Sequence, residues 1–172
     1  AVVKPLELID VIPAAEQTRR QRRSDSPCFP LWDLLDKVCD PEIPALSLWQ
    51  LGVLQDIEAH GREITVTITP TYSGCPAMTA MAEDITSALA AVGYSEVKIE
   101  TRLSPAWTTD WLSVEAREQL RGTGIAPPLT TIKCPRCESV EVQLLREFGS
   151  TACKALCQCS RCAELFDYFK PL

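Results

Sequence analysis

The stretches Cys134-Pro-Arg-Cys137 and Cys159-Ser-Arg-Cys162 are two Cys-x2-Cys pairs near the end of the sequence. Each pair places two thiols on one tight turn, so together they offer four thiolates. Four thiolates suit a tetrahedral ion, with metal–sulfur distances of about 2.3 Å for zinc. The spacing therefore predicts a metal-bound module, with Cys134, Cys137, Cys159 and Cys162 as its ligands.

Three short strands are expected around these pairs, over residues 141–148, 152–158 and 165–169. The two cysteine turns would lie where the strands meet, which is the plan of a zinc ribbon. We expect this β module to cover residues 132–172.

Cys153 and Cys157 lie between the two pairs and leave two alternatives open. Alternate residues of a strand share a face, so both would point the same way as Cys159. Either could replace a metal ligand, or the two could form a redox pair. We favour one cysteine packed in the core and one spare thiol, because four ligands already complete a tetrahedral site.

The composition fits one or two small domains with a real core, since 46% of the 172 residues are hydrophobic. The net charge of −6 argues against nucleic-acid binding. No apolar run approaches the roughly 20 residues of a membrane span, and early charges argue against a secretory signal. The count of nine cysteines is odd, and the two close Cys-x2-Cys pairs suit metal binding better than disulfides, which favours a reducing cytoplasm.

The preceding sequence predicts an α+β domain over residues 28–121. Helical spacing of apolar residues indicates one helix over 31–38 and a second over 78–92. Alternating apolar and polar residues indicate three strands, over 53–60, 64–69 and 97–103. The order helix, strand, strand, helix, strand favours one sheet with both helices on one face.

Two less regular segments complete the organisation. Ser113 is expected to cap a short helix, after which the glycines and prolines of residues 122–131 indicate a linker. Residues 1–27 are expected to be a partly ordered extension. Its basic run, residues 19–23, is either a docking patch for an acidic partner or the solvated face of a short helix; we favour the second.

Cys75 is the second candidate for chemistry. It follows a strand and precedes Pro76, which suits the start of a helix. Free N–H groups there would lower the pKa of the thiol. Cys75 is then a transient ligand for iron or a cluster, or a nucleophile, or a buried cysteine that caps the helix. Asp40 and Glu42 are its nearest candidate partners.

Ordinary acid–base or nucleophilic catalysis has little support in the sequence. The single histidine, His60, lies beside Gly61 in an expected hairpin turn. There is no glycine-rich phosphate loop of either common type. The available side chains are thiols and carboxylates, which suit metal handling better than hydrolysis.

Several motifs resemble known families. The segments 40–44 (Asp-Pro-Glu-Ile-Pro), Gly52-Val53 and 71–76 (Thr-Tyr-Ser-Gly-Cys-Pro) resemble the small domain of iron–sulfur assembly factors. Together with 104–111 (Ser-Pro-Ala-Trp-Thr-Thr-Asp-Trp), 124–128 (Gly-Ile-Ala-Pro-Pro) and the cysteine module, residues 31–172 resemble the D-subunit family of bacterial phenylacetyl-CoA oxygenase (ring 1,2-epoxidase) systems.

The resemblance implies an accessory component of a monooxygenase system in phenylacetate catabolism rather than a catalyst. It would assist iron or iron–sulfur centre assembly through Cys75, with Asp40 and Glu42 as loop neighbours. The four module cysteines would hold a structural metal, expected to be zinc. Its partners would be the di-iron subunit or the iron–sulfur reductase, and a homodimer stays open. Cys157 stands where relatives are expected to carry an aromatic residue.

Two other functions remain as alternatives. The chain could be a structural subunit that stabilises the oxygenase without handling metal. It could also be an electron-transfer protein with iron or a cluster on the C-terminal cysteines. Zinc is colourless and iron–sulfur centres are coloured, so the visible spectrum separates the last alternative from the others.

Overall fold

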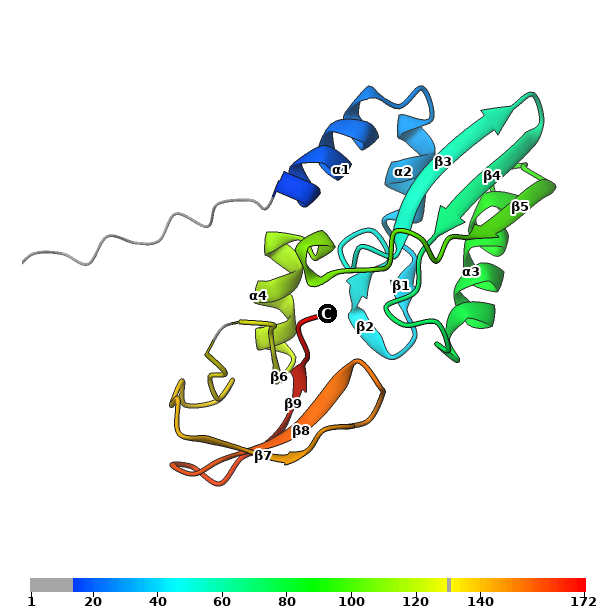
Figure 1. The fold of residues 1–172 in the computed structure, drawn as a ribbon. Helices are drawn as coiled ribbons and strands as arrows, with labels where there is room; N and C mark the ends of the chain where they lie inside the picture. Colours follow the sequence, from blue (N-terminus) through cyan, green and yellow to red (C-terminus); the bar gives the residue numbers. More distant parts are fainter. Residues whose placement is uncertain (1–13, 130) are drawn as a thin grey trace, which may run out of the picture.

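The computed structural model describes residues 14–129 and 131–172. The prediction for residues 1–13 therefore lies outside the described part of the chain. Figure 1 shows the arrangement of the elements. In chain order these are α1 (Ala14–Asp25), α2 (Phe29–Leu35), β1 (Cys39–Asp40), β2 (Ile43–Ser47), β3 (Leu54–His60), β4 (Glu63–Ile68), α3 (Met78–Ala90), β5 (Glu96–Thr101), a 3-10 turn (Thr109–Trp111), α4 (Val114–Gly122), β6 (Ile125–Ala126), β7 (Val142–Arg146), β8 (Lys154–Cys159) and β9 (Leu165–Phe169).

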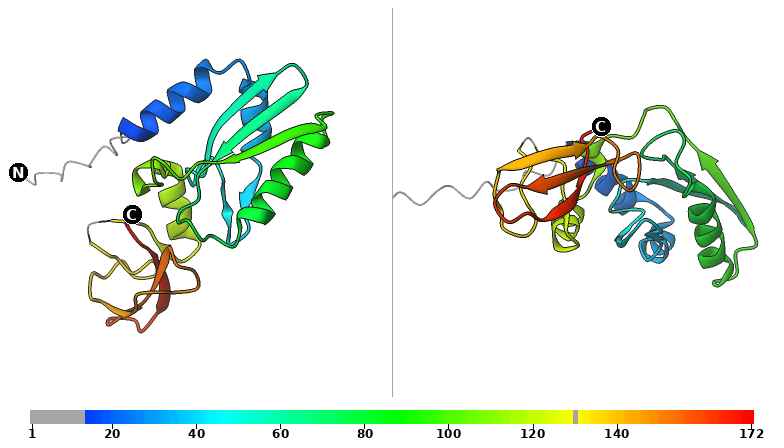
Figure 2. Two further views of the ribbon diagram at one scale, coloured as in Figure 1. Left: turned by 45° about the vertical axis from the view of Figure 1, so that its right-hand side comes forward. Right: turned by 90° about the horizontal axis from the view of Figure 1, so that it is seen from below.

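A three-stranded sheet forms the centre of the first module, which we define as α2 to β5. β4 lies in the middle, antiparallel to β3 and parallel to β5. The helices α2 and α3 cover one face of this sheet (Figures 1 and 2). Leu35, Ile85 and Leu89 of their apolar stripes are fully buried in the same hydrophobic cluster as Ile64 and Ile68 of β4. The predicted α+β class and one-sided helix layer are confirmed.

The chain between Asp40 and Ile43 forms the tight turn that joins β1 to β2. One carboxylate oxygen of Asp40, Oδ1, accepts hydrogen bonds from the backbone N–H groups of Glu42 (2.8 Å) and Ile43 (2.9 Å). Such a side-chain bond to the following backbone fixes a turn. It therefore sets the position of Glu42 as well as that of Asp40.

The basic run belongs to α1 and is not simply a solvated face. Arg19 is buried, and its guanidinium donates to the carbonyl oxygens of Trp111 (2.6 Å), Trp49 (2.9 Å) and Leu54 (3.1 Å). Arg20 pairs with Glu16 and Glu115, while Arg23 pairs with Asp33 and Asp36. The expectation of a solvated face is wrong for Arg19, because the carbonyl oxygens satisfy its buried charge.

The C-terminal ribbon is a four-stranded sheet in the order β6-β9-β8-β7. Three of its strands match the expected ones, and β6 comes from the segment predicted as a linker. β6 pairs in parallel with β9 through Ile125 and Ala126. The predicted domain boundaries stay predictions. The segment predicted as a linker also contributes a strand, β6, to the ribbon sheet.

The first module and the ribbon share a hydrophobic core. The Trp107 ring lies 5.8 Å from that of Phe169 at the end of β9, and its Nε1 donates to the carbonyl oxygen of Leu51 (3.1 Å). Phe169 and Cys153 belong to the apolar cluster that fills the first module. Among the described residues, no helix combines the length and apolar character that crossing a bilayer requires.

Candidate metal centre and thiol site

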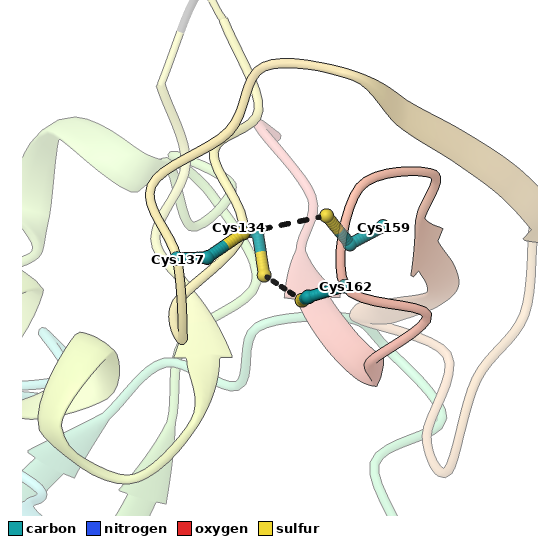
Figure 3. A group of neighbouring side chains, drawn as sticks. All are labelled: Cys134, Cys137, Cys159 and Cys162. Carbon is teal, nitrogen blue, oxygen red and sulfur yellow. Dashed lines mark hydrogen bonds between the residues drawn. The ribbon is translucent and has the colours of Figure 1, made fainter.

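Four thiols converge at one end of the ribbon, as Figure 3 shows. The Sγ atoms of Cys134 and Cys162 are 3.7 Å apart, and those of Cys137 and Cys159 are 3.6 Å apart. All four sulfur atoms lie within 4.8 Å of one another. Two ligands placed about 2.3 Å from a tetrahedral ion are about 3.8 Å apart, whereas disulfide sulfurs are about 2.05 Å apart. The spacing therefore fits a shared metal ion.

The two cysteine turns repeat one backbone design. The N–H of Glu138 donates to the carbonyl oxygen of Cys134 (2.9 Å), and that of Ala163 donates to Cys159 (3.0 Å). Glu138 and Ala163 adopt positive φ angles of 57° and 61°. This left-handed conformation lets the backbone reverse its direction directly after the second cysteine of each pair. The sequence spacing thus folds into two matching knuckles.

Backbone donors favour the thiolate at Cys159. At Cys137 the N–H of Ser139 acts in the same direction, but burial and the neighbouring thiols outweigh it and raise the pKa of Cys137 to about 12. Hydrogen bonds from the N–H groups of Cys162 and Arg161 lower the pKa of Cys159 to about 7. An ion pair of 2.7 Å between Arg136 and Glu164 joins one knuckle to the segment after the other. Four neighbouring thiols, two of which accept hydrogen bonds from backbone N–H groups, are the donor set of a closed structural metal site.

Cys75 lies in the loop between β4 and α3 and is half-buried. Its sulfur accepts a hydrogen bond from the N–H of Ala77, as expected near a helix start. The predicted lowering of its pKa is nevertheless wrong. Burial raises the pKa of this thiol, and the negative charges of Glu42, Asp40 and Cys153 raise it further. α3 begins only at Met78, so its N-terminal N–H groups do not outweigh burial.

Asp40 and Glu42 lie close enough to this thiol for their charges to raise its pKa. Asp40 is buried, and burial raises its pKa while the two turn N–H groups and Lys154 oppose the rise. Tyr72 of the same loop completes the group. Burial and the charges of Cys75, Glu42 and Cys153 raise the pKa of its hydroxyl. The β1–β2 turn and the loop before α3 therefore meet at one point.

The ribbon contributes Cys153 and Lys154 to the same region, which sequence reasoning missed. Cys153 is 5% exposed and belongs to the apolar cluster of the first module. Lys154 is also buried; it lies 3.9 Å from Asp167 and close enough to Asp40 to affect its pKa. The only signal in the sequence was that four other cysteines already complete the ribbon centre, which leaves Cys153 without a role there.

The other cysteines have structural positions. Cys157 packs in the ribbon core beside Phe166 and Tyr168, apart from the cluster that holds Cys153. Neither Cys153 nor Cys157 joins the four-thiol group. Cys28 lies in the core of the first module, and Cys39 is half-buried in β1. The strand therefore separates the two extra cysteines into different cores.

Comparison with known families matches both parts of the molecule. Residues 31–100 match the family described as iron-sulfur cluster assembly protein, and residues 123–170 match the PaaD zinc beta ribbon domain. A crystal structure of a domain of unknown function, DUF59, from Bacillus anthracis covers 60% of this chain and 95% of its own, with 22% identity and a TM-score of 0.50. This likeness supports the fold alone. The molecule is thus an iron–sulfur-assembly-type domain joined to a zinc ribbon.

Two curated proteins resemble the chain at the sequence level. The Escherichia coli (strain K12) protein assigned as the D-subunit of 1,2-phenylacetyl-CoA epoxidase is 45% identical over 149 residues, covering 81% of this chain and 90% of that protein. The chain belongs to this D-subunit family. A Porphyromonas gingivalis (strain ATCC BAA-308 / W83) protein named Fe-S protein maturation auxiliary factor is 38% identical over 90 residues, covering 51% of this chain and 84% of that protein.

Proposed function

We propose that this protein is an accessory maturation factor for a phenylacetyl-CoA oxygenase of the 1,2-epoxidase type. In this role Cys75 transiently binds iron or an iron–sulfur cluster on its way to the di-iron subunit or the iron–sulfur reductase. The family match and the likeness of residues 31–100 to assembly proteins support the role. All nine cysteines are free thiols, which suits action in the reducing cytoplasm.

The observation that carries the proposal is the setting of Cys75. Its half-buried thiol lies on a loop beside the carboxylates of Asp40 and Glu42. Thiolate and carboxylate are both ligands for iron, and a site with few thiolates holds its metal less firmly than a closed four-thiolate centre. An accessible, incomplete ligand set suits cargo that must arrive and leave.

The ribbon centre has a different role in this proposal. Cys134, Cys137, Cys159 and Cys162 hold zinc, which would supply structural cross-linking rather than chemistry when bound. We expect about one zinc per chain in purified protein and no visible colour. Stoichiometric iron with a coloured spectrum in anaerobic protein would instead support the electron-transfer alternative.

The proposal is tested by co-expressing Cys75→Ser with the oxygenase components. The oxygenase should assemble normally but contain less iron or cluster, and epoxidation should fall in proportion to the missing metal. Metal content per purified oxygenase is the deciding measurement. Cys28→Ser is the matched control, because Cys28 is a buried thiol that lies between α1 and α2, outside the loop that carries Cys75. Full metal content with Cys75→Ser would contradict the maturation role.

A structural subunit is the second candidate, and one observation favours it. The outer part of the ribbon exposes several large apolar side chains, and β7 is an edge strand of its sheet. These side chains are Val140, Leu144, Leu145, Phe148 and Leu165. Exposed apolar groups on an edge strand suit docking to another protein. Under this candidate the Cys75→Ser oxygenase keeps its metal, whereas Leu144→Asp lowers the recovery of the assembled complex.

A further inference from the structure

We infer that Cys153 of the ribbon supplies a second thiolate to the Cys75 site, so that the first module and the ribbon together form one binding site for a ferrous ion. This inference rests on the proposed function and names a second protein thiol that would bind the iron together with Cys75. The ribbon would then be part of the iron site as well as a docking module.

The position of Cys153 is the first step. It lies where the β7–β8 turn enters β8, and this turn faces the loop before α3 in Figure 1 and both views of Figure 2. The ribbon core takes in Ala155, Cys157 and Cys159 from β8. Cys153 instead joins the apolar cluster of the first module, against which Cys75 also packs. The residue that precedes β8 therefore places its thiol in the core of the first module.

The surrounding contacts hold the backbone at Cys153 in place. The carbonyl oxygen of Cys153 accepts a hydrogen bond from the N–H of Lys170 (3.0 Å). Its sulfur lies 3.0 Å from the hydroxyl oxygen of Thr151. Next to Lys170, Phe169 is fully buried against Trp107. Of these contacts, only the one between Phe169 and Trp107 crosses to the cluster of the first module; because Phe169 pairs with Lys154, it holds the start of β8 against that module.

Charge balance supports a divalent cation at this point. Two thiolates neutralise the charge of Fe²⁺, which matters because burying a net charge costs free energy. Glu42 is half-buried beside Cys75 and offers an oxygen ligand. The buried Lys154 lies near Asp40 and offsets the charge of that carboxylate. The donor set is thus two thiolates and a carboxylate, so bound Fe²⁺ would carry one excess negative charge, at the half-buried Glu42.

The binding step involves no oxidation. The two S–H groups release their protons to solvent and two S–Fe bonds form, so Fe²⁺ keeps its oxidation state. Among the described residues, only the four ribbon thiols already lie close together as a metal-binding group. The site at Cys75 must draw its ligands together when iron enters and separate them when it leaves. That is the behaviour expected of a transfer site.

Cobalt(II) is a suitable probe, because thiolate-bound Co²⁺ has charge-transfer absorption in the near ultraviolet. Full-length protein with its ribbon filled by zinc is titrated anaerobically with Co²⁺, and retained zinc is measured after each addition. Wild type should bind one equivalent. Loss of an outer-shell partner alone lowers metal affinity about 10–100-fold, so Cys75→Ser or Cys153→Ser should weaken binding at least that much. Cys28→Ser, a buried thiol of the same core, should bind like wild type.

X-ray absorption at the cobalt edge gives a measurement on wild type that does not depend on how a variant folds. We expect two sulfur neighbours at about 2.3 Å together with oxygen neighbours. A single sulfur neighbour would overturn the inference. Four sulfur neighbours would place cobalt in the ribbon and also overturn it.

The variants separate this inference from the proposed function. If Cys75→Ser lowers oxygenase iron while Cys153→Ser binds cobalt and matures the oxygenase normally, Cys75 acts without Cys153. The proposed function then stands and the inference fails. If both variants bind Co²⁺ like wild type, the inference fails regardless of the oxygenase result.

Discussion

Gly52 shows how one residue of the motif Gly52-Val53 meets a purely steric demand. Its φ angle is +77°, a conformation that L side chains rarely adopt. A Cβ atom there would lie 2.7 Å from Cβ of Trp111 and 2.8 Å from its carbonyl oxygen. Glycine is therefore required twice, for the backbone angle and for the close approach of the segment that carries Trp111.

Gly52→Ala should consequently destabilise the protein by more than the backbone angle alone explains. The left-handed angle costs about 1–2 kcal/mol for a non-glycine residue. Overpacking against Trp111 adds about 1–3 kcal/mol. Gly61→Ala is the control, since Gly61 also has a positive φ, of 67°, but no atom lies within 4 Å of its added Cβ. Urea unfolding measures the free energy of unfolding of both variants. An equal loss of stability in the two variants would rule out the steric contribution.

At the scale of elements, α1 shows how a charged helix becomes part of the core. The guanidinium of Arg19 spans three carbonyl oxygens and stacks over the Trp49 ring, with its Cζ 4.2 Å from the ring centroid. Burial lowers the pKa of Arg19 to about 10, although Glu16 opposes this. A planar group with several fixed donors suits this arrangement better than an ammonium.

Arg19→Lys should therefore loosen α1 although it keeps the charge. Lysine cannot span the three carbonyl oxygens, and each hydrogen bond to a charged group is worth about 1.5–3 kcal/mol. We expect a loss of about 2–4 kcal/mol, with faster hydrogen exchange over residues 14–25. Arg22→Lys is the matched control on the same helix. Arg22 is 44% exposed and 3.8 Å from Asp56, so its replacement should change stability by less than about 1 kcal/mol.

At the scale of the whole molecule, a metal ion bound by the four ribbon thiols would support more than the ribbon. Phe169 and Cys153 complete the core of the first module, and Thr109 donates to the carbonyl oxygen of Leu172 (3.1 Å). A change in the ribbon should therefore reach the first module through these contacts. Without that shared core, each module would lose its structure independently.

Chelation of the metal should unfold the ribbon and weaken the segment that packs against it. Binding of structural zinc contributes apparent free energies of about 10–16 kcal/mol in small zinc modules. Hydrogen exchange should rise over residues 154–172 and also over 105–112, while β4 stays protected. Adding zinc back should restore both segments. Unchanged protection of residues 105–112 in metal-free protein would show that the modules are not coupled.

Much of the fold follows from local patterns. The helical stripes, the alternating strands and the two Cys-x2-Cys turns are short-range signals, and all of them lead to the observed elements. The cap of α4 is another local signal: Ser113 accepts a hydrogen bond from the N–H of Ala116 (3.0 Å), as predicted. The β1–β2 turn was less visible, because a carboxylate and two nearby N–H groups create it.

The sequence by itself determined the two modules, the four-thiol group and the loop that carries Cys75, since spacing along the chain decides each of them. Only the tertiary structure decided the state of the Cys75 thiol, because burial outweighs the helix start and raises its pKa. It also decided the place of Cys153. Strand alternation assigns this cysteine to the ribbon face, but it lies just before β8 begins and packs in the core of the neighbouring module, and no local pattern records where two modules meet.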